Sequence, residues 1–202
     1  MSLYQFPKIS FNTLYFDNYA IKLGKKLEGH PLKSIFFSNF ASIMAQKKIE
    51  KTNAARLLDR AKIEYELIPY EVDESNLAAT HVAEQLGEDI RSVFKTLVLK
   101  GDRSGYFVCV IPGNMEVDLK VAARISSNKK CDLIPMKELL PTTGYIRGGC
   151  SPIGLKKPFP IFLHSSAELF PSIFISAGVR GLQIKISPKD LIAFTRATLF
   201  DM

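Results

Sequence analysis

A glycine-rich stretch at residues 143–154 carries the strongest chemical signal in this chain. It reads Thr-Gly-Tyr-Ile-Arg-Gly-Gly-Cys-Ser-Pro-Ile-Gly, and we call it the glycine loop. Glycine lets the backbone adopt positive φ and lets a ligand approach main-chain N–H groups closely. The stretch therefore favours a shaped loop that offers backbone amides to an oxygen-rich group. A cluster of glycine and proline is equally typical of a purely structural turn.

Lys95 is the second candidate, because it lies within the apolar run Val-Phe-Lys-Thr-Leu-Val-Leu at residues 93–99. In a strand, alternation places its side chain on the same face as Val93, Leu97 and Leu99. A lysine on an apolar face costs free energy unless its ammonium reaches water, a counter-charge or a ligand. The amine could extend past its neighbours to solvent. A desolvated lysine would instead have a lowered pKa and could stabilise charge or carry a proton.

Three further features add polar groups. Residues 176–181 form a second strand-to-glycine turn, in which Arg180 could bind a phosphate through its guanidinium or simply lie on the surface. Residues 111–114 end a strand in a Pro-Gly turn, which could line a pocket or only reverse the chain. Tyr70 offers a hydroxyl and a ring that could stack on a base, or it could belong to the core.

The cysteines and histidines give no sign of a metal site or of disulfide bonds. The three cysteines (109, 131 and 150) are odd in number and lack a C-x-x-C pair, so the sequence suggests neither a disulfide framework nor a zinc ribbon and favours a reducing compartment. The three histidines are scattered without ligand spacing. Cys150 lies in the glycine loop but has no local histidine as a base, so we do not expect it to be a nucleophile.

Length and charge bound the possible functions. A chain of 202 residues with 47% hydrophobic content fits one globular domain that buries its own core. The net charge of +7 is compatible with a polyanionic partner such as a nucleic acid, but many basic proteins bind no such partner. The apolar run at residues 35–45 is too short to span a membrane, so no membrane partner is expected. We expect residues 44–202 to be the compact domain, and residues 1–43 to be either an N-terminal extension or sequence upstream of a natural start at Met44.

The elements that must position these residues are short. Thr52 is expected to cap a helix that places Ala54, Leu57, Leu58 and Ala61 on one face. Further short helices are predicted over residues 80–86 and 118–125 and after Ser187, and a short element broken by a proline over 133–140. Strands are predicted over residues 65–72, 93–100, 106–111, 161–164, 173–176 and 182–187. The pattern indicates an α+β domain around a curved, mixed, barrel-like β-sheet with peripheral short helices.

Taken together, three motifs resemble the YbaK/EbsC family, which is related to the editing domain inserted in bacterial prolyl-tRNA synthetases. They are Phe-Lys-Thr-Leu around Lys95, the glycine loop, and Ser-x-Gly-x-Arg-Gly at residues 176–181, and they occur in the family's order. The resemblance covers about residues 48–200 and leaves out residues 1–43. Two positions depart from some relatives, which carry Asp where this chain has Gln183 and Lys where it has Val179.

The resemblance implies a trans-editing deacylase that clears cysteine from mischarged tRNA(Pro). It implies no cofactor, a cytoplasmic protein, the acceptor end of aminoacylated tRNA(Pro) as substrate, and prolyl-tRNA synthetase as a partner. Lys95 matches the family's essential lysine, and Tyr70 falls where the family has a pocket tyrosine. The substrate-binding residues implied are Tyr70, Thr143, Gly144, Gly148, Gly149, Ser151, Pro152, Ser176, Gly178, Arg180 and Gln183.

The expected chemistry needs no nucleophile from the protein, because an aminoacyl ester is already activated and mainly needs positioning and charge stabilisation. In the family, the thiol of the substrate is thought to attack its own carbonyl and to leave as a cyclic thiolactone. Lys95 and the backbone N–H groups of residues 148–151 would then hold the aminoacyl end. Two alternatives stay open at this point: hydrolysis of Ala-tRNA(Pro) by water, and a non-catalytic module that binds RNA or a synthetase.

Overall fold

The computed structural model describes residues 49–202, so the predicted extension at residues 1–43 and the first residues of the predicted 44–202 domain lie outside the described part. The five helices of this part are α3 (Asn53–Ala61), α4 (Ala79–Leu86), α5 (Leu119–Ile125), α6 (Met136–Thr143) and α7 (Pro188–Thr195), and two 3₁₀ turns cover Ile90–Ser92 and Ser165–Leu169. The eight strands are β1 (Tyr65–Pro69), β2 (Phe94–Gly101), β3 (Gly105–Pro112), β4 (Cys131–Leu133), β5 (Ile161–His164), β6 (Ile173–Ser176), β7 (Leu182–Ile186) and β8 (Thr198–Phe200).

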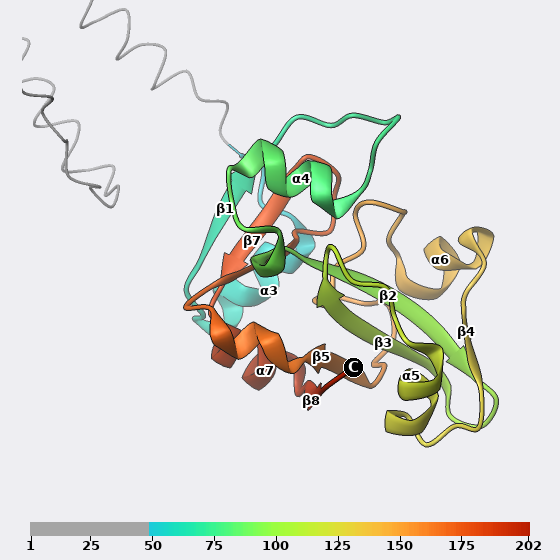
Figure 1. Ribbon diagram of the computed structural model, residues 1–202. Helices are drawn as coiled ribbons and strands as arrows, with labels where there is room; N and C mark the ends of the chain where they lie inside the picture. The colour runs from blue at the N-terminus through green and yellow to red at the C-terminus, as the bar shows by residue number, and fades with distance from the viewer. Residues whose placement is uncertain (1–48) are drawn as a thin grey trace, which may run out of the picture. The chain divides into compact units, whose positions relative to one another are not determined.

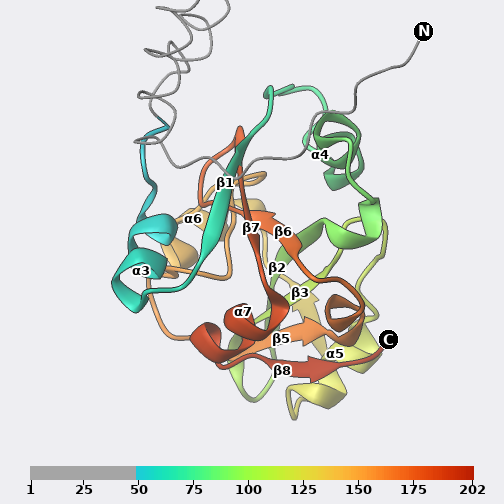
Figure 2. The same ribbon diagram turned by 90° about the vertical axis from the view of Figure 1, so that its left-hand side faces the viewer.

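The strands form two sheets, which confirms the α+β class (Figure 1). One sheet has the order β1-β7-β6 and is antiparallel, and the other has the order β4-β2-β3-β5-β8. The larger sheet is mixed, because β5 runs parallel to both β3 and β8 (Figure 2). Neither strand order returns to its first strand within residues 49–202, so the predicted barrel-like closure is not confirmed.

The local elements form for reasons that the sequence makes visible. Thr52 caps α3, since its hydroxyl accepts a hydrogen bond from the Ala55 N–H at 3.2 Å. Ala54 and Leu58 of this helix are fully buried, as their spacing predicts. The predicted hairpin is also present, and β2 and β3 pair in register from Phe94 opposite Pro112 to the glycines at the turn.

The main hydrophobic core lies between the two sheets. It joins Phe94 and Val98 of the larger sheet to Ile175 and Ile184 of the smaller one, and Leu191 of α7 packs against them. A second cluster covers the opposite face of the larger sheet, where α5 packs on alternate residues of β2 and β3. Both faces of β2 are therefore covered with apolar side chains, so a charged side chain on this strand needs a specific reason.

Within residues 49–202, most of one edge of β2 is left without a strand partner. β3 pairs with the other edge along the whole strand, whereas β4 pairs with this edge only at residues 99–101. The smaller sheet reaches β2 through a single parallel bridge between Val93 and Phe174. Residues 94–98 therefore face a gap between β4 and the smaller sheet, and within this segment Val98 already uses its carbonyl to accept the Ile134 N–H. Free strand edges expose backbone donors and acceptors that can bind a ligand.

Candidate functional site

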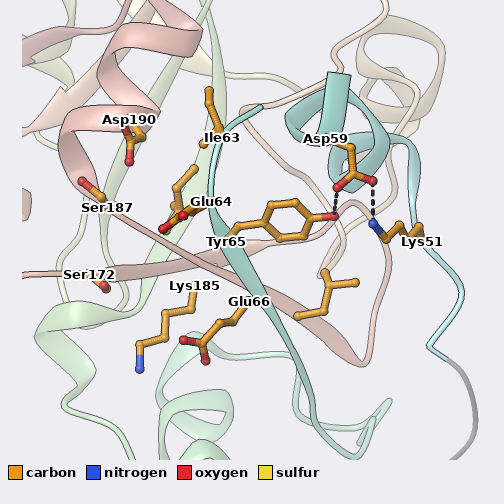
Figure 3. Close-up of a pocket in the computed structure, with 12 residues that line it drawn as sticks. Lys51, Asp59, Ile63, Glu64, Tyr65, Glu66, Ser172, Lys185, Ser187 and Asp190 are labelled. Carbon is orange, nitrogen blue, oxygen red and sulfur yellow. Dashed lines mark hydrogen bonds and ion pairs between the residues drawn. The ribbon is translucent and has the colours of Figure 1, made fainter. Parts of the chain in front are cut away.

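Two hollows in the described part of the chain could each hold a small ligand. One, about 670 Å³, lies beside β1 and α7 and contains none of the predicted site residues (Figure 3). Three of its polar side chains bind one another, since Asp59 accepts from Lys51 at 2.7 Å and from the Tyr65 hydroxyl at 3.0 Å. These three groups bind one another and the hollow contains none of the predicted site residues, so it is the weaker candidate.

The second hollow, about 450 Å³, lies along the free edge of β2, and we call it the β2-edge pocket. It is bounded by β2, by the start of α4, by the β4–α6 connection, by the glycine loop, and by the ends of β6 and β7. Its polar lining comes from segments that are far apart in the sequence: Tyr70, Lys95, Thr96, Arg147, Gly148, Cys150, Ser176 and Gln183. Five of the predicted site residues are therefore in one pocket, namely Tyr70, Lys95, Gly148, Ser176 and Gln183.

Lys95 is half-buried at this pocket, and its Nζ donates a hydrogen bond to the Gly113 carbonyl at 3.0 Å. Burial lowers the pKa of the Lys95 ammonium, and the charge of Glu116 opposes that shift. No carboxylate of the described residues forms a salt bridge with the amine. Because an ammonium has three donors, the group retains hydrogen-bonding capacity and a positive charge for a ligand.

Two oxygens in buried surroundings have no hydrogen-bond partner in the described part of the chain: Thr96 Oγ1 and Gln183 Oε1. Both residues line the β2-edge pocket, and Gln183 is only 5% exposed. An unpaired buried polar atom costs free energy, so such atoms gain most from a ligand that supplies a donor. Sequence reasoning marked Gln183 but missed Thr96. The feature that could have indicated Thr96 in the sequence is a hydroxyl residue between the apolar residues Phe94 and Val98.

The other predicted site residues do not line the β2-edge pocket. They are Thr143, Gly144, Gly149, Ser151, Pro152, Gly178 and Arg180. Thr143 Oγ1 donates to the Leu139 carbonyl at 2.7 Å and accepts from the Tyr145 N–H at 3.0 Å, and Ser151 accepts from Ile153 at 3.2 Å. These contacts shape the glycine loop, and a direct role in binding the substrate stays a prediction for all seven.

Arg180 and Arg147 differ in position. The Nε of Arg180 donates to the Arg147 carbonyl at 2.9 Å, and its Nη1 lies 3.4 Å from Glu74. Its guanidinium thus ties the turn at residues 176–181 to the glycine loop. Arg147 itself is exposed and lines the pocket, so it is the arginine placed to meet an anionic ligand. Sequence reasoning missed Arg147, although its place beside Gly148 in the glycine loop was a usable signal.

Comparison with known proteins identifies the family. The family model described as the aminoacyl-tRNA editing domain matches residues 74–194, which contain Lys95, the glycine loop and Gln183. The chain belongs to the aminoacyl-tRNA editing domain family. The predicted resemblance to the YbaK/EbsC family is thereby confirmed.

The relatives agree with this assignment. The chain is 47% identical over 153 residues to EbsC of Enterococcus faecalis, whose name marks it as a candidate Cys-tRNA(Pro)/Cys-tRNA(Cys) deacylase, and the match covers 75% of this chain and 93% of EbsC. It is 31% identical over 78 residues to a proline–tRNA ligase of Fervidobacterium nodosum, which covers 39% of this chain and 13% of the ligase.

A solved structure shares the fold of the editing domain. It is that of a candidate trans-editing enzyme for prolyl-tRNA synthetase, with a TM-score of 0.64 and 23% identity, and it covers 75% of this chain and 98% of its own. Within residues 49–202, no helix is long and apolar enough to cross a membrane. The same residues contain no group of three or more His, Cys, Asp or Glu side chains placed to hold a metal ion.

Tyr145 and Gly178 bring the editing domain's glycine loop against the turn that follows β6. The Tyr145 hydroxyl donates to the Ile153 carbonyl at 2.6 Å, so the ring braces the loop from inside. Gly178 has φ +97°, and a Cβ at this position would lie 2.9 Å from the Tyr145 ring. Gly105 also has a positive φ, of +76°, but a Cβ there would meet nothing within 4 Å.

We expect Gly178→Ala to destabilise the editing domain by about 2–3 kcal/mol, because both backbone strain and the contact with Tyr145 oppose it. The control variant Gly105→Ala shares the backbone cost without the clash and should lose only about 1 kcal/mol. Urea unfolding of both variants measures the difference. Equal losses would show that the Tyr145 contact contributes nothing.

Cys150 lines the pocket of the editing domain as a buried thiol. Burial raises its pKa to about 12, so the thiolate is scarcely populated near neutral pH. Cys109 is a matched thiol in the second core cluster, since burial also raises its pKa to about 12 and it does not line the pocket. Variants of Cys150 and Cys109 can therefore be compared to distinguish a thiol that takes part in the reaction from a thiol that only packs.

We expect Cys150→Ala to keep kcat for deacylation within about threefold of wild type, because a thiol cannot act as a nucleophile without ionising. Cys109→Ala reports the general cost of losing a buried thiol. The two variants are compared in single-turnover deacylation of cysteinyl-tRNA. A loss of two orders of magnitude in Cys150→Ala alone would instead establish a covalent role for Cys150.

Proposed function

We propose that this editing domain deacylates mischarged tRNA(Pro) and that cysteine is the amino acid it removes. The observation that carries the proposal is the meeting of Lys95 with the glycine loop in one pocket, beside two oxygens that lack partners. An aminoacyl ester presents a carbonyl oxygen, an ammonium group and a small side chain. The pocket offers the Lys95 cation to the carbonyl oxygen, and it offers the oxygens of Thr96 and Gln183 as acceptors to the ammonium group.

In this proposal Lys95 stabilises the negative charge that develops on the ester carbonyl. Its burial strengthens that interaction, since charges act more strongly in a partly water-excluded site. Of the glycine loop, Gly148 and Cys150 line the pocket and offer their N–H groups to the same end of the substrate, whereas the Gly149 N–H already donates to the Ile146 carbonyl at 3.0 Å. Thr96 Oγ1 and Gln183 Oε1 accept hydrogen bonds from the α-ammonium group, which supplies the partners that they lack. Gln183 would thus keep a polar contact at the position where some relatives carry an acid.

The nucleophile in this proposal comes from the substrate. Among the described residues, the lining of the β2-edge pocket includes no His, Asp or Glu that could act as a base for a protein hydroxyl. The cysteinyl sulfur attacks its own carbonyl carbon, a C–S bond forms, and the C–O bond to the ribose breaks. The thiol proton ends on the ribose oxygen, which leaves tRNA with a free hydroxyl and the amino acid as a cyclic thiolactone.

The partners follow from the same reasoning. The substrate is the acceptor end of aminoacylated tRNA(Pro), and the exposed Arg147 at the pocket suits its phosphates. We propose that prolyl-tRNA synthetase supplies part of the tRNA selection, with the similarity to a proline–tRNA ligase as support. Editing of tRNA would place the protein's action in the cytoplasm.

The decisive experiment compares cysteinyl-, alanyl- and prolyl-tRNA(Pro) with the purified full chain and identifies the released products. We expect cysteinyl-tRNA to be cleaved fastest and prolyl-tRNA to be spared. Faster release of alanine would instead establish an alanine-specific deacylase that uses water. Binding of all three without cleavage would establish a non-catalytic RNA-binding module.

A further inference from the structure

The charges of the described domain are divided between two parts of the chain. Residues 95–160 carry eleven Lys and Arg against five Asp and Glu, whereas residues 49–94 carry five against ten. The basic part includes α5, β4 and α6, on the right of the domain in Figure 1, and the acidic part includes α3, β1 and α4, on the left. Such a division favours the basic side for contact with a polyanion.

Three exposed cations of the basic part lie on two turns that are bound to each other, and we call them the cationic tip. Arg103 is in the β2–β3 turn, and Lys129 and Lys130 are in the connection between α5 and β4. The Asn128 Oδ1 accepts a hydrogen bond from the Arg103 N–H at 2.9 Å. In the opposite direction, Asp102 Oδ1 accepts from the N–H groups of Lys129 at 3.0 Å and Lys130 at 3.3 Å.

The backbone beneath the cationic tip is held in one arrangement. Asn128 is only 9% exposed, and its Nδ2 donates to the Ser104 hydroxyl at 2.7 Å and to the Ser126 carbonyl at 3.0 Å. Its side chain packs so closely on β2 that a Cβ at Gly101 would lie 2.2 Å from it. The cationic tip is therefore carried by a fixed surface rather than by a free loop.

The charges of the cationic tip are not neutralised within the described part of the chain. None of its three cations forms a salt bridge there. Two acids are close in sequence, but Asp102 directs one carboxylate oxygen to backbone N–H groups, and Asp132 lies opposite Lys100 in the β2–β4 register. Like charges that are held together repel one another, so binding of an anion is favoured at this surface.

The cationic tip adjoins the β2-edge pocket. β4 begins directly after Lys130 and ends at Leu133, which lines the pocket, so the two are separated by roughly 10 Å of strand. On β2, Lys95 and Gly101 are six residues apart, which corresponds to roughly 20 Å. A nucleic acid whose end lies at Lys95 can therefore reach the cationic tip with its preceding phosphates.

We propose that Arg103, Lys129 and Lys130 bind the phosphate backbone of the tRNA acceptor arm, outside the β2-edge pocket. The proposal rests on the proposed function for the position of the 3′ end of the tRNA. Phosphates carry no sequence information, so these contacts add affinity and orient the arm without reading bases. The selection of tRNA(Pro) is then left to other contacts.

The first test is the salt dependence of binding of uncharged tRNA(Pro) to the full chain, with Arg103→Gln/Lys129→Gln/Lys130→Gln as the variant. We expect about 10–30-fold weaker binding near physiological salt. The plot of log K against log salt should lose about 2–3 of its slope, because each lost phosphate contact lowers the slope by about 1. An unchanged slope in this variant would overturn the proposal.

A charge-matched control removes three exposed cations that lie outside both the cationic tip and the β2-edge pocket. It is the variant Arg56→Gln/Arg60→Gln/Lys189→Gln. It should weaken binding by less than about threefold, because only long-range, screened attraction is lost. Equal losses in the two variants would reduce the cationic tip to a general charge effect and overturn the proposal.

The second test exchanges the cations without removing their charge. The variant Arg103→Lys/Lys129→Arg/Lys130→Arg keeps three positive charges on the same backbone, so it should bind tRNA within about threefold of wild type. Weak binding by this variant, equal to that of the Gln variant, would show that the loss follows from altered structure and would reject the phosphate contacts.

The third test locates the contact on the tRNA and separates it from catalysis. A minihelix that contains only the acceptor stem and the CCA end should show the same loss of affinity as whole tRNA, and a loss on whole tRNA alone would overturn the assignment to the acceptor arm. At saturating protein, the Gln variant should deacylate cysteinyl-tRNA within about twofold of the wild-type single-turnover rate. A loss of affinity in a protein whose wild type deacylates nothing would support the cationic tip and reject the proposed function.

Discussion

Lys95→Met is expected to lower kcat/KM for deacylation of cysteinyl-tRNA by about 10²–10³-fold, because it removes the cation that we propose stabilises the developing oxyanion. Methionine keeps an unbranched side chain of similar length, so the packing around β2 should survive. The measurement is single-turnover deacylation, with tRNA binding measured in parallel. A loss of catalysis with tRNA affinity largely retained supports the proposed role of Lys95.

The matched control is Lys100→Met. Lys100 lies on the same strand but is exposed, does not line the pocket, and places its Nζ 5.3 Å from the centre of the Tyr106 ring. This variant removes the same charge from the same strand, so it accounts for any general electrostatic effect on tRNA binding. Equal activity losses in the two variants would contradict a specific role for Lys95.

Unfolding measurements separate lost activity from lost structure. Burial lowers the pKa of Lys95 in the folded protein, so just below the ordinary lysine value of 10.5 the unfolded chain binds more protons than the folded one. Wild-type stability should therefore rise with pH through that window, and Lys95→Met should lack this rise. At neutral pH the variant should be at least as stable as wild type, because it no longer holds a partly desolvated ammonium.

The second large effect is expected from the substrate. Cysteinyl-tRNA(Pro) should be cleaved about 10³-fold faster than seryl-tRNA(Pro), because an oriented thiol within the substrate acts at a high effective concentration. If the pocket discriminated by the size of the side chain alone, the cleavage rates of such close analogues would differ only by about 10–200-fold. Single-turnover rates on the same tRNA, charged with each amino acid, measure the ratio.

Product analysis distinguishes the mechanism behind that ratio. Rapid quenching followed by mass spectrometry should detect cysteine thiolactone before it hydrolyses. A tRNA charged with S-methylcysteine is the control, since it keeps the side chain but has no ionisable thiol. Cleavage of the S-methyl or seryl substrate at the cysteinyl rate would show that water is the nucleophile and would remove the substrate thiol from the mechanism.

Local signals in the sequence predicted the elements that depend on local chemistry. The α3 helix follows from the Thr52 cap and from the helical spacing of Ala54 and Leu58. The β2–β3 hairpin follows from two β-rich runs that flank a glycine turn. The division into two sheets could not be predicted in this way, because it depends on which strand edges meet across the core. β4 and β8 have only three residues each, too few for an alternating pattern to identify a strand.

The candidate site likewise contains residues that local sequence signals predicted and residues that only the structure identified. Lys95 was predictable because a charge within an apolar strand needs an explanation. Thr96 was not selected, since a threonine in a strand is ordinary until the structure shows its oxygen without a partner. Thr143 and Arg180 match family motifs, yet here they bind backbone carbonyls that shape the glycine loop. A sequence motif can contain residues that shape a loop as well as residues that contact a ligand. Only the geometry of the structure distinguishes the two kinds.

The pairing of β1 with β7 has a consequence for biosynthesis. β1 has β7 as its sheet partner, so it stays unpaired on the ribosome until residues 182–186 have emerged. Lys95 likewise emerges long before Ser176 and Gln183, which complete its pocket. Nascent or truncated chains should therefore have no deacylase activity. They should also expose β1 to chaperones or to pairing with other chains until synthesis reaches β7.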